Sequence, residues 1–579
     1  MTMLTKWGAA LDRSCPLPEY PRPQLRRESF YNLNGVWDYA VTPSGDEPEV
    51  WDGEIVVPFS PEAPLSGAAR GPAKDEYLHY RRGFTLPEGF QKSRVLLHFG
   101  AVDNDCVILV NHREVGRHSG GYWPFSADIT SLLREGENIL RVTVRDNADD
   151  PTFAYGKQRY KRGGMWYTAQ SGIWQTVWLE SVPEVYVKSL RITPEFDEAR
   201  VRIELETALE SSAAITCDVR AADGSFVAGS WAKGGVCVVP LPGFRAWTPD
   251  DPYLYTLDIT CGEDRVESYF AMRKFSYVEL DGHKVFGLNN APLFHNGLLD
   301  QGYYPDGLLT PPSDEAMVND IETMKRCGFN MLRKHIKIEP LRWYYHCDRL
   351  GMIVWQDMVS GGQPYSFLHV SALPTLGKVD LPDQDAKPYG RSGVLSRARF
   401  RREMADTVRL LYNCPCIALW TVFNEGWGQF DALDMANELK KLDPTRFIDH
   451  ASGWQDQGYE EMKSRHIYFR PVKLKNDGRA LALTEYGGYI LAVDGHRWTD
   501  KVFGYRICRD SAALAHDYEK LMLGQVLPHI RKEGLTAAVY TQITDVEEEL
   551  NGLMTYDREV LKIPEETLRE INAALRFDA

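Results

Sequence analysis

The chain has 579 residues, of which 44% are hydrophobic and 25% are charged, so it is long enough for several domains and has an ordinary globular composition. Its 66 basic and 81 acidic residues give a net charge of −15, which argues against nucleic acid or an anionic membrane as a partner. The 15 Trp, 29 Tyr and 23 Phe fit either β-rich cores or a protein that stacks aromatic rings on the apolar faces of sugars.

The beginning of the sequence has no continuous apolar segment of the kind found in signal peptides. No stretch approaches the roughly 18 apolar residues of a membrane span. The ten cysteines are scattered and none is spaced C-x-x-C, which predicts buried thiols rather than a zinc ribbon. We therefore expect a cytoplasmic protein without a membrane partner.

Two β-rich regions come first. Residues 1–182 contain short alternating segments at 35–41, 95–99, 106–110, 138–144 and 174–180, separated by turn residues, which predicts a jelly-roll β-sandwich. Residues 183–276 continue with alternating segments at 201–205, 215–219 and 254–259, which favours a small immunoglobulin-like sandwich. Neither region shows a catalytic constellation of its own.

From residue 277 to 579 apolar strands alternate with helical segments. Strands are predicted at 293–299, 330–333, 352–355, 416–423, 447–449, 466–468, 480–483 and 537–543. Helices are predicted at 314–327, 339–350, 395–411, 430–442 and 511–531. Eight strands over this length indicate a (β/α)8 TIM barrel. A doubly wound sheet is the alternative, but no G-x-G-x-x-G motif follows the first strand.

Two of the predicted barrel strands end in a glutamate. Glu425 follows the fourth strand and Glu485 follows the seventh, and each precedes a loop that contains glycine. Because barrel enzymes carry their catalytic groups at the carboxyl ends of the strands, both carboxylates are expected to face one mouth. Three aromatic residues accompany them and are expected to surround them: Trp427, Tyr486 and Tyr489. The alternative for each glutamate is a helix cap or an ion pair.

Several motifs resemble glycoside hydrolase family 2, the group of β-galactosidases, β-glucuronidases and β-mannosidases. They are Leu-Asn-Gly-Val-Trp at 33–37, Ser-Gly-Ile-Trp-Gln-Thr-Val-Trp-Leu-Glu at 171–180, Phe-Asn-Glu at 423–425 and Thr-Glu-Tyr-Gly at 484–487. The resemblance covers essentially the whole chain. It implies a jelly-roll sugar-binding domain, an immunoglobulin-like domain and a catalytic barrel.

The resemblance also implies a retaining exo-β-glycosidase that acts by double displacement. Glu425 would be the acid/base, Glu485 the nucleophile, and Asn424 a donor to the sugar 2-hydroxyl. This chemistry requires no metal or other cofactor. The implied partner is a carbohydrate or glycoside, and a homo-oligomer stays open.

Departures from the family pattern bear on the sugar. The family's N-x-x-R-x-S-H-Y-P segment corresponds to residues 330–340, where Arg333 is retained but His335 stands one place early, after Lys334. The loop after the first strand, which usually carries a histidine, carries Asp300 and Gln301 instead. We count all five as candidate substrate-binding residues.

The glucuronidases of the family carry Asn-x-Lys near the eighth strand, where this chain has Asn551-Gly552-Leu553. The missing lysine favours a neutral glycone, with a β-galactoside first. Lys334 and Lys337 are alternative cations, so β-glucuronidase is kept, as are arabinosidase and galactofuranosidase. For Lys334 the competing interpretation is an ion pair with Asp300 or Asp357.

Further mouth positions are candidates for sugar binding, each with core packing as its alternative: Trp355, Asp357, His450, Trp454, Tyr486, Trp498 and Gln542. Arg333 is expected to pair with a catalytic carboxylate. Two other classes compete with a glycosidase. A carbohydrate-binding protein without catalysis fits the β domains equally well, but it would not need both glutamates. A barrel isomerase or aldolase would need a strand-end lysine or a metal cluster.

Overall fold

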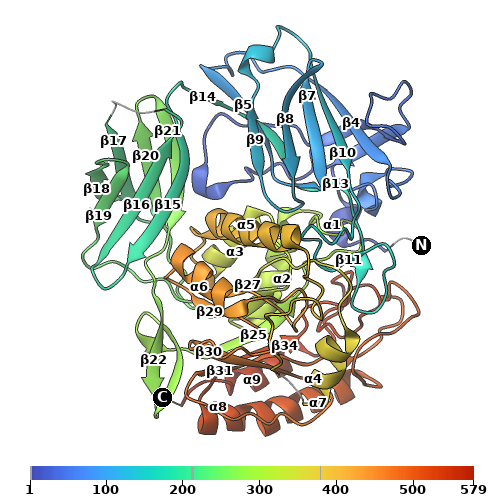
Figure 1. Ribbon diagram of the computed structural model, residues 1–579. Helices are drawn as coiled ribbons and strands as arrows, with labels where there is room; N and C mark the ends of the chain where they lie inside the picture. The colour runs from blue at the N-terminus through green and yellow to red at the C-terminus, as the bar shows by residue number, and fades with distance from the viewer. Residues whose placement is uncertain (1–2, 210–213, 378–379, 579) are drawn as a thin grey trace.

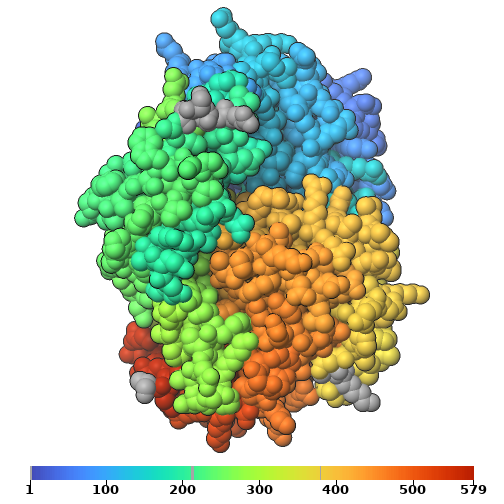
Figure 2. Space-filling view, turned by 60° about the vertical axis from the view of Figure 1, so that its left-hand side comes forward, coloured from blue at the N-terminus to red at the C-terminus, as the bar shows by residue number. Residues whose placement is uncertain are grey.

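The computed structural model describes residues 3–209, 214–377 and 380–578, and it comprises two β domains and an α/β barrel (Figure 1). The first domain (blue) lies above the barrel, and the second (green) lies beside both. The view turned by 60° shows the second domain running down one side of the molecule, against the first domain above and the barrel alongside (Figure 2).

The first domain is a sandwich of two antiparallel sheets. One sheet has the order β3 (Gly53–Val57), β2 (Gly35–Thr42), β4 (Tyr77–Phe84), β10 (Asn138–Arg145), β7 (Asp105–Val110) and β8 (Arg113–Ser119). The other has the order β1 (Tyr31–Asn32), β14 (Val177–Val182), β5 (Arg94–Phe99) and β9 (Phe125–Asp128). Alternate residues of these strands form a shared apolar core. The predicted sandwich is confirmed, although β14 begins at Val177 rather than 174. The jelly-roll strand order stays a prediction.

The second domain is a smaller sandwich, in which the described residues form seven strands. Its three-stranded sheet has the order β15 (Val187–Glu195), β16 (Arg200–Thr207) and β19 (Val236–Pro240). Its four-stranded sheet has the order β18 (Phe226–Trp231), β17 (Ile215–Arg220), β20 (Tyr255–Cys261) and β21 (Asp264–Phe270). Burial alternates strictly along β17 and β20, which confirms the period-two pattern.

A β-hairpin that the sequence analysis did not predict precedes the barrel. It consists of β22 (Phe275–Leu280) and β23 (His283–Leu288), with the short β24 (Ala291–Pro292) beside β23. Phe286 of the hairpin stacks on Phe447, with ring centroids 4.3 Å apart, and packs edge-on against Trp355. The hairpin therefore covers the amino-terminal end of the barrel, opposite the mouth.

Eight parallel strands form the nearly closed barrel. In chain order they are β25 (His295–Asp300), β26 (Met331–Lys334), β27 (Ile353–Asp357), β28 (Ile417–Thr421), β29 (Phe447–Asp449), β30 (Met462–Ile467), β31 (Ala480–Gly487) and β34 (Leu535–Thr541). The ladder is continuous from β29 through β25 and β34 to β30. The predicted TIM barrel is confirmed, with each strand within a few residues of its expected position.

The helices around the barrel also lie where the sequence predicts them, except the last one, at Glu565–Ala573, which the sequence analysis does not predict. They are α2 (Asp314–Arg326), α3 (Leu341–Leu350), α5 (Val394–Leu411), α6 (Ala432–Leu442), α7 (Ser511–Leu521), α8 (Leu527–Glu533) and α9 (Glu565–Ala573), with the short α1 (Lys6–Ala9) and α4 (Leu373–Thr375) elsewhere. No helix joins β29 to β30 or β30 to β31, two connections that lie wholly within the described residues. The carboxyl ends of β29, β30 and β31 therefore continue into loops.

A segment of the first domain, residues 154–168, lies on the barrel. The N–H of Gly156 donates to the carbonyl of Ser360, and the hydroxyl of Tyr155 donates to the carbonyl of Gly362. At the other end of the segment, the N–H of Thr168 donates to the carboxylate of Glu547. These partners follow β27 and β34, so the segment contributes to the mouth of the barrel.

The structure bears on two predictions made for the whole chain, buried thiols and the lack of a membrane span. Nine of the ten cysteines are buried and Cys15 is exposed, which agrees with the predicted buried thiols. In the part of the chain that is described, no helix is both long enough and apolar enough to cross a membrane.

Candidate active site

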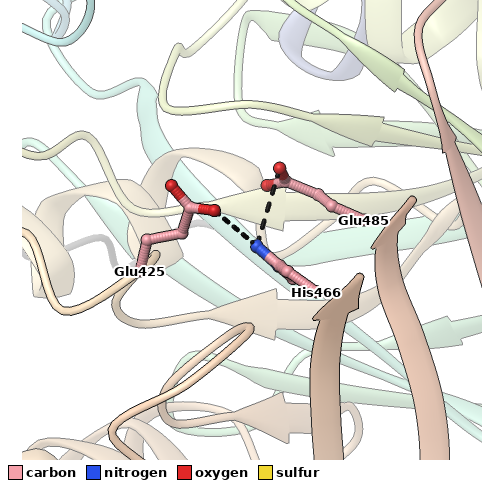
Figure 3. Close-up of side chains that lie close together, drawn as sticks. All are labelled: Glu425, His466 and Glu485. Atoms are coloured by element: carbon pink, nitrogen blue, oxygen red, sulfur yellow. Dashed lines mark hydrogen bonds and ion pairs between the residues drawn. The ribbon is translucent and has the colours of Figure 1, made fainter. Parts of the chain in front are cut away.

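Glu425, which follows β28, and Glu485, near the end of β31, lie close together at the carboxyl end of the barrel, as the sequence predicts (Figure 3). One carboxylate oxygen of each, together with Nδ1 of His466, form a set in which all atoms lie within 4.8 Å of one another. Retaining glycosidases hold their carboxyl groups about 5–5.5 Å apart, whereas inverting enzymes need about 6.5–9.5 Å. The close approach of the two carboxylates therefore favours the retaining over the inverting geometry.

The backbone holds Glu425 in an unusual conformation. Its φ is +54°, in the left-handed region that costs a non-glycine residue energy. Two hydrogen bonds fix it there: its N–H donates to the carbonyl of Ser452 over 2.9 Å, and its carbonyl accepts from Nε1 of Trp454 over 2.9 Å. Trp454 is thus part of the site, through the backbone of Glu425.

Glu485 is held by two donors. Nη1 of Arg333 donates to its Oε1 over 3.2 Å, and the hydroxyl of Tyr468 donates to its Oε2 over 2.6 Å. The pairing of β31 shifts register against β30 and against β34 next to this residue. Such irregularities re-aim a side chain at the end of a strand.

Arg333 connects most of the polar residues of the site. Its guanidinium binds Asp357 through two hydrogen bonds of 2.9 and 3.0 Å and donates to Oδ1 of Asn424 over 2.8 Å. Asp357 also contacts Nδ1 of His335 over 2.8 Å. Because Arg333 only donates, the amide oxygen of Asn424 must face it, which leaves the amide nitrogen of Asn424 to donate elsewhere.

The two glutamates have different charge environments. Burial raises the pKa of Glu425 to about 7, against the opposing positive charges of Lys157 and Arg333. Burial also raises the pKa of Glu485, and the charge of Glu425 adds to this, while His466, Arg333 and the Tyr468 hydroxyl favour its ionised form. Of the two, Glu485 alone has an arginine at ion-pair distance among the described residues. The pair is therefore arranged to carry one proton on Glu425 and one negative charge on Glu485.

The same atoms could in principle hold a metal ion, because Glu425, His466 and Glu485 each offer one ligand. Nδ1 of His466 lies 2.9 Å from Oε1 of Glu425, which is a hydrogen-bond distance. Two ligands about 2.0–2.1 Å from a tetrahedral zinc would stand roughly 3.3 Å apart. The contact thus fits a shared proton better than a metal centre, and the expectation that the reaction needs no metal stays a prediction.

Sequence models of three domains of one family match the chain in order. They are "Glycosyl hydrolases family 2, sugar binding domain" at residues 64–183, "Glycosyl hydrolases family 2" at 185–273 and "Glycosyl hydrolases family 2, TIM barrel domain" at 310–474. The chain belongs to glycoside hydrolase family 2. The resemblance stated from the motifs is thereby confirmed.

Relatives within family 2 carry two kinds of name. A β-galactosidase of Halalkalibacterium halodurans is 23% identical over 78% of this chain and 45% of its own length. A β-glucuronidase of Paenibacillus borealis is 22% identical over 82% of this chain and 85% of its own. The chain spans about half the length of the first curated relatives, 45% and 47%.

Solved structures of the family share the fold over nearly the whole chain. A β-glucuronidase of an uncultured Clostridium species has a TM-score of 0.74 at 19% identity and covers 95% of this chain and 98% of its own. A β-galacturonidase of Eisenbergiella tayi bound to galacturonate has a TM-score of 0.72 at 19% identity and covers 96% of this chain and 99% of its own. At this identity the similarity establishes the fold.

Lys334 and Asp300 do not lie in the mouth of this family 2 barrel, contrary to their place among the substrate-binding candidates. Nζ of Lys334 lies 2.6 Å from Asp300 and 2.8 Å from Glu339, above the ring of Trp343 on helix α3. Arg333 and Lys334 are neighbours on β26, so their side chains point to opposite faces. Arg333 points into the barrel and Lys334 into the helix layer, where the competing ion pair with Asp300 is what the structure shows.

Three more candidates are placed away from the carboxylates. Trp355 is fully buried in the middle of the barrel, where its Nε1 donates to Nδ1 of His295. Tyr486 is fully buried behind β31 and its hydroxyl contacts the sulfur of Met522. His450 is buried beside Tyr459 and accepts from the N–H of Gln457. The burial of all three agrees with the core-packing alternative, and their contact with a substrate stays a prediction.

None of the remaining candidates makes a hydrogen bond or ion pair with either glutamate among the described residues. Gln301 donates to Gln542 over 2.9 Å, which joins the carboxyl ends of β25 and β34. Trp498 lies under the guanidinium of Arg162, 4.2 Å from it. Trp427, expected to surround the carboxylates, is buried against Trp166 of the first domain.

Sequence reasoning missed three residues of the site. His466 and Tyr468 lie at the end of β30, a strand that was predicted but whose polar end was not considered. The rule that placed Glu425 and Glu485 would have found them. Lys157 belongs to the first domain, and its charge acts on Glu425, His335 and Glu549. No pattern in the sequence indicates that this segment reaches the barrel.

Proposed function

We propose that the chain is a retaining exo-β-glycosidase that removes a terminal sugar by double displacement. The observation that carries this proposal is the close pair of buried carboxylates, of which one is bound to Arg333 and Tyr468 and the other is not. A nucleophile must be ionised and an acid must hold a proton, and the surroundings of Glu485 and Glu425 favour these two states respectively.

In the first step the carboxylate of Glu485 attacks the anomeric carbon, and the bond from that carbon to the leaving oxygen breaks. The proton of Glu425 passes to the leaving oxygen. In the second step the carboxylate of Glu425 takes a proton from water, the resulting hydroxide oxygen bonds to the anomeric carbon, and the ester to Glu485 breaks. The configuration at the anomeric carbon is retained because it is inverted twice.

Asn424 is proposed to bind the sugar 2-hydroxyl. Its amide oxygen accepts from Arg333, so its amide nitrogen is the group available to a substrate. A hydrogen bond to that hydroxyl strengthens as charge develops at the neighbouring anomeric carbon.

For the glycone we propose a neutral sugar, with a β-galactoside first. Lys334 is 0% exposed and occupied by Asp300 and Glu339, and Asn551 is not followed by a lysine at 553. Lys337 is likewise buried and bound to Glu339. A substrate carboxylate would thus find neither of these lysines free, and an unpaired buried charge is costly.

A β-uronide is the second candidate. Lys157 makes no ion pair with a carboxylate among the described residues, yet its charge acts on the site. A substrate carboxylate near Lys157 would find a free cation there. The relatives and solved structures of the family include proteins named β-galactosidase, β-glucuronidase and β-galacturonidase, so both a neutral sugar and a uronide occur among their names.

A panel of nitrophenyl β-glycosides that includes galactoside, glucuronide and galacturonide tests both parts. We expect galactoside to be cleaved fastest, with the β-anomer of the free sugar appearing first by proton NMR. A preference of more than about tenfold in kcat/KM for a uronide, about 1.4 kcal/mol, would reverse the choice of glycone. First release of the α-anomer would exclude Glu485 as nucleophile. Binding without turnover of any glycoside would favour the non-catalytic carbohydrate-binding alternative.

A further inference from the structure

The side chains behind Glu425 form a chain of hydrogen bonds that runs in one direction. Nε2 of His466 lies 3.2 Å from Oγ of Ser452, and the Ser452 hydroxyl donates to Oγ1 of Thr484 over 2.9 Å. The Thr484 hydroxyl in turn donates to the backbone carbonyl of Arg465 over 3.5 Å. All of these side chains are buried.

The direction of this chain fixes the tautomer of His466. The carbonyl of Arg465 can only accept, so Thr484 uses its single proton there and accepts from Ser452. Ser452 has then used its own proton and must accept from His466. Nε2 of His466 therefore carries the proton of the neutral imidazole, and Nδ1 carries a lone pair.

That lone pair faces the acid. Nδ1 of His466 lies 2.9 Å from Oε1 of Glu425 and 3.6 Å from Oε2 of Glu485 (Figure 3). A lone pair and an ionised carboxylate oxygen at 2.9 Å would repel each other. The contact becomes a hydrogen bond when Glu425 is protonated and donates to Nδ1.

We propose that His466 is a positioning residue whose Nδ1 accepts a hydrogen bond from the protonated carboxyl of Glu425, and that it thereby holds the proton that the acid delivers. The proposal rests on the proposed function only in calling Glu425 the acid. Once Glu425 has given its proton to the leaving group, its negatively charged carboxylate lies next to the lone pair on Nδ1 of His466, with no proton between them. This contact makes Glu425 a stronger base for taking a proton from water in the second step.

The charges around the pair are consistent with a neutral imidazole. Burial lowers the pKa of His466 to about 4. The negative charges of Glu485 and Asp357 raise this pKa, and the positive charges of Arg333 and Arg465 lower it further. Lys157 and Arg333 face Glu425 and oppose its protonation. The alternative is an imidazolium that donates to an ionised Glu425 from Nδ1.

Two substitutions separate the two nitrogens of His466. In histidine Nδ1 is bonded to Cγ, so His466→Asn can place an amide oxygen where Nδ1 stands and still accept from Glu425. His466→Gln reaches the position of Nε2 instead, and it keeps the contact with Ser452 while removing the acceptor. Ser452→Ala is the third variant, because loss of the hydroxyl releases the constraint on the tautomer.

The measurement is kcat/KM against pH on a substrate whose leaving group needs protonation. In the wild type we expect the basic limb near pH 7, where Glu425 loses its proton. His466→Gln and Ser452→Ala should move that limb to lower pH by about one unit, a tenfold loss on its alkaline side. His466→Asn should keep the limb near the wild-type position. A uniform loss of rate with no shift of the limb, or the same shift in His466→Asn as in His466→Gln, would overturn the proposal.

Nuclear magnetic resonance tests the same point without turnover. With ¹³C-labelled glutamate, the Glu425 carboxyl signal, assigned by its absence in Glu425→Gln, should titrate near pH 7 in wild type and lower in His466→Gln. The ¹⁵N shifts of His466 at pH 6 should be those of the Nε2–H tautomer. An Nδ1–H tautomer or an imidazolium there would refute the proposal, even if a variant fails to fold. If no glycoside is cleaved, the proposed function fails, and this titration still decides the role of His466.

Discussion

Two buried cations stand next to each other on β26, and they belong to different parts of the molecule. Arg333 and Lys334 are both 0% exposed, and each binds two carboxylates. The carboxylates of Arg333 are Asp357 and Glu485, inside the barrel. Those of Lys334 are Asp300 and Glu339, between the strands and the helix layer. One residue along a strand thus separates the candidate active site from a structural ion cluster.

The two clusters differ in what they leave unsatisfied. Around Lys334 the charges are matched by a second cation, since Lys337 also contacts Glu339 and donates to the carbonyl of Leu309. Around Arg333 the amide nitrogen of Asn424 and Oε2 of Glu425 remain for a substrate, while Oε1 of Glu425 contacts His466. A buried charge cluster therefore indicates a functional site when some of its polar groups still lack partners, rather than by burial alone.

The largest effect is expected from removing Glu485, the proposed nucleophile, on the Arg333 side. Glu485→Ala should lower kcat by about 10⁴-fold on every substrate, because no other carboxylate can form the ester. Steady-state rates on good and poor leaving groups measure this. Glu403→Gln, a buried glutamate on helix α5, is the matched control and should keep its activity. Retention of more than about a tenth of the activity in Glu485→Ala would exclude its role.

The Lys334 side should respond in stability and not in catalysis. Lys334→Met leaves Asp300 without its cation, so unfolding free energy should fall by about 3–5 kcal/mol. Denaturant unfolding measures this, and kcat/KM of the folded fraction should stay within about twofold. Adding Asp300→Asn should recover part of the loss. Unchanged stability with selective loss of uronide cleavage would return Lys334 to the substrate pocket.

The third effect concerns Glu425, which has no arginine or lysine at ion-pair distance in the described part of the chain. Its pKa is raised in the fold from 4.5 to about 7, so the folded state binds a proton that the unfolded state has lost. Stability should therefore fall as pH rises from about 4.5 to 7, by up to about 3 kcal/mol, and then level off. Glu425→Gln removes this fall in stability between pH 4.5 and 7, because glutamine does not ionise. Thermal unfolding should show it stabilised at pH 8 relative to wild type and not at pH 4.5, and an equal effect at both would contradict the assignment.

The smallest effect is expected when the charge of Arg333 is kept and its shape is changed. Arg333→Lys cannot bind Asp357, Glu485 and Asn424 together, so kcat/KM should fall by about 10- to 100-fold. Arg446→Lys is the matched control, since Arg446 is equally buried but binds Asp443 and carbonyls outside the mouth. That variant should lose stability and keep its rate per folded molecule. Equal rate losses in both would show that Arg333 is structural.

The sequence predicts a large share of this architecture from local patterns. Period-two alternation gives the two β domains, and eight short apolar segments separated by helices give the barrel. The strand ends then identify Glu425, Glu485 and Asn424, because a carboxylate directly after an apolar barrel strand points to the mouth. Asp357 follows from the same rule, whereas Arg333 is identified by its place in the family's segment at residues 330–340.

Other parts of the site depend on which face of a strand a side chain takes. Strands of a parallel barrel are buried on both faces, so their sequences show little alternation, and nothing in them distinguishes Arg333 from Lys334 or Glu485 from Tyr486. The structure turns Lys334 toward the helix layer, contrary to its predicted place at the substrate. Tyr486, Trp355 and His450 are buried, and their contact with a substrate stays a prediction.

The sequence by itself determined the three-part architecture, the order of the barrel strands and the two glutamates at their ends, because these depend on periodicity and on the position of a residue along a strand. Only the tertiary structure decided that Lys157 of the first domain reaches the barrel, that His466 stands between the two carboxylates, and that Lys334 faces the helices. These features either join residues far apart in the chain or depend on which face of a strand a side chain takes. Local sequence carries no information on either.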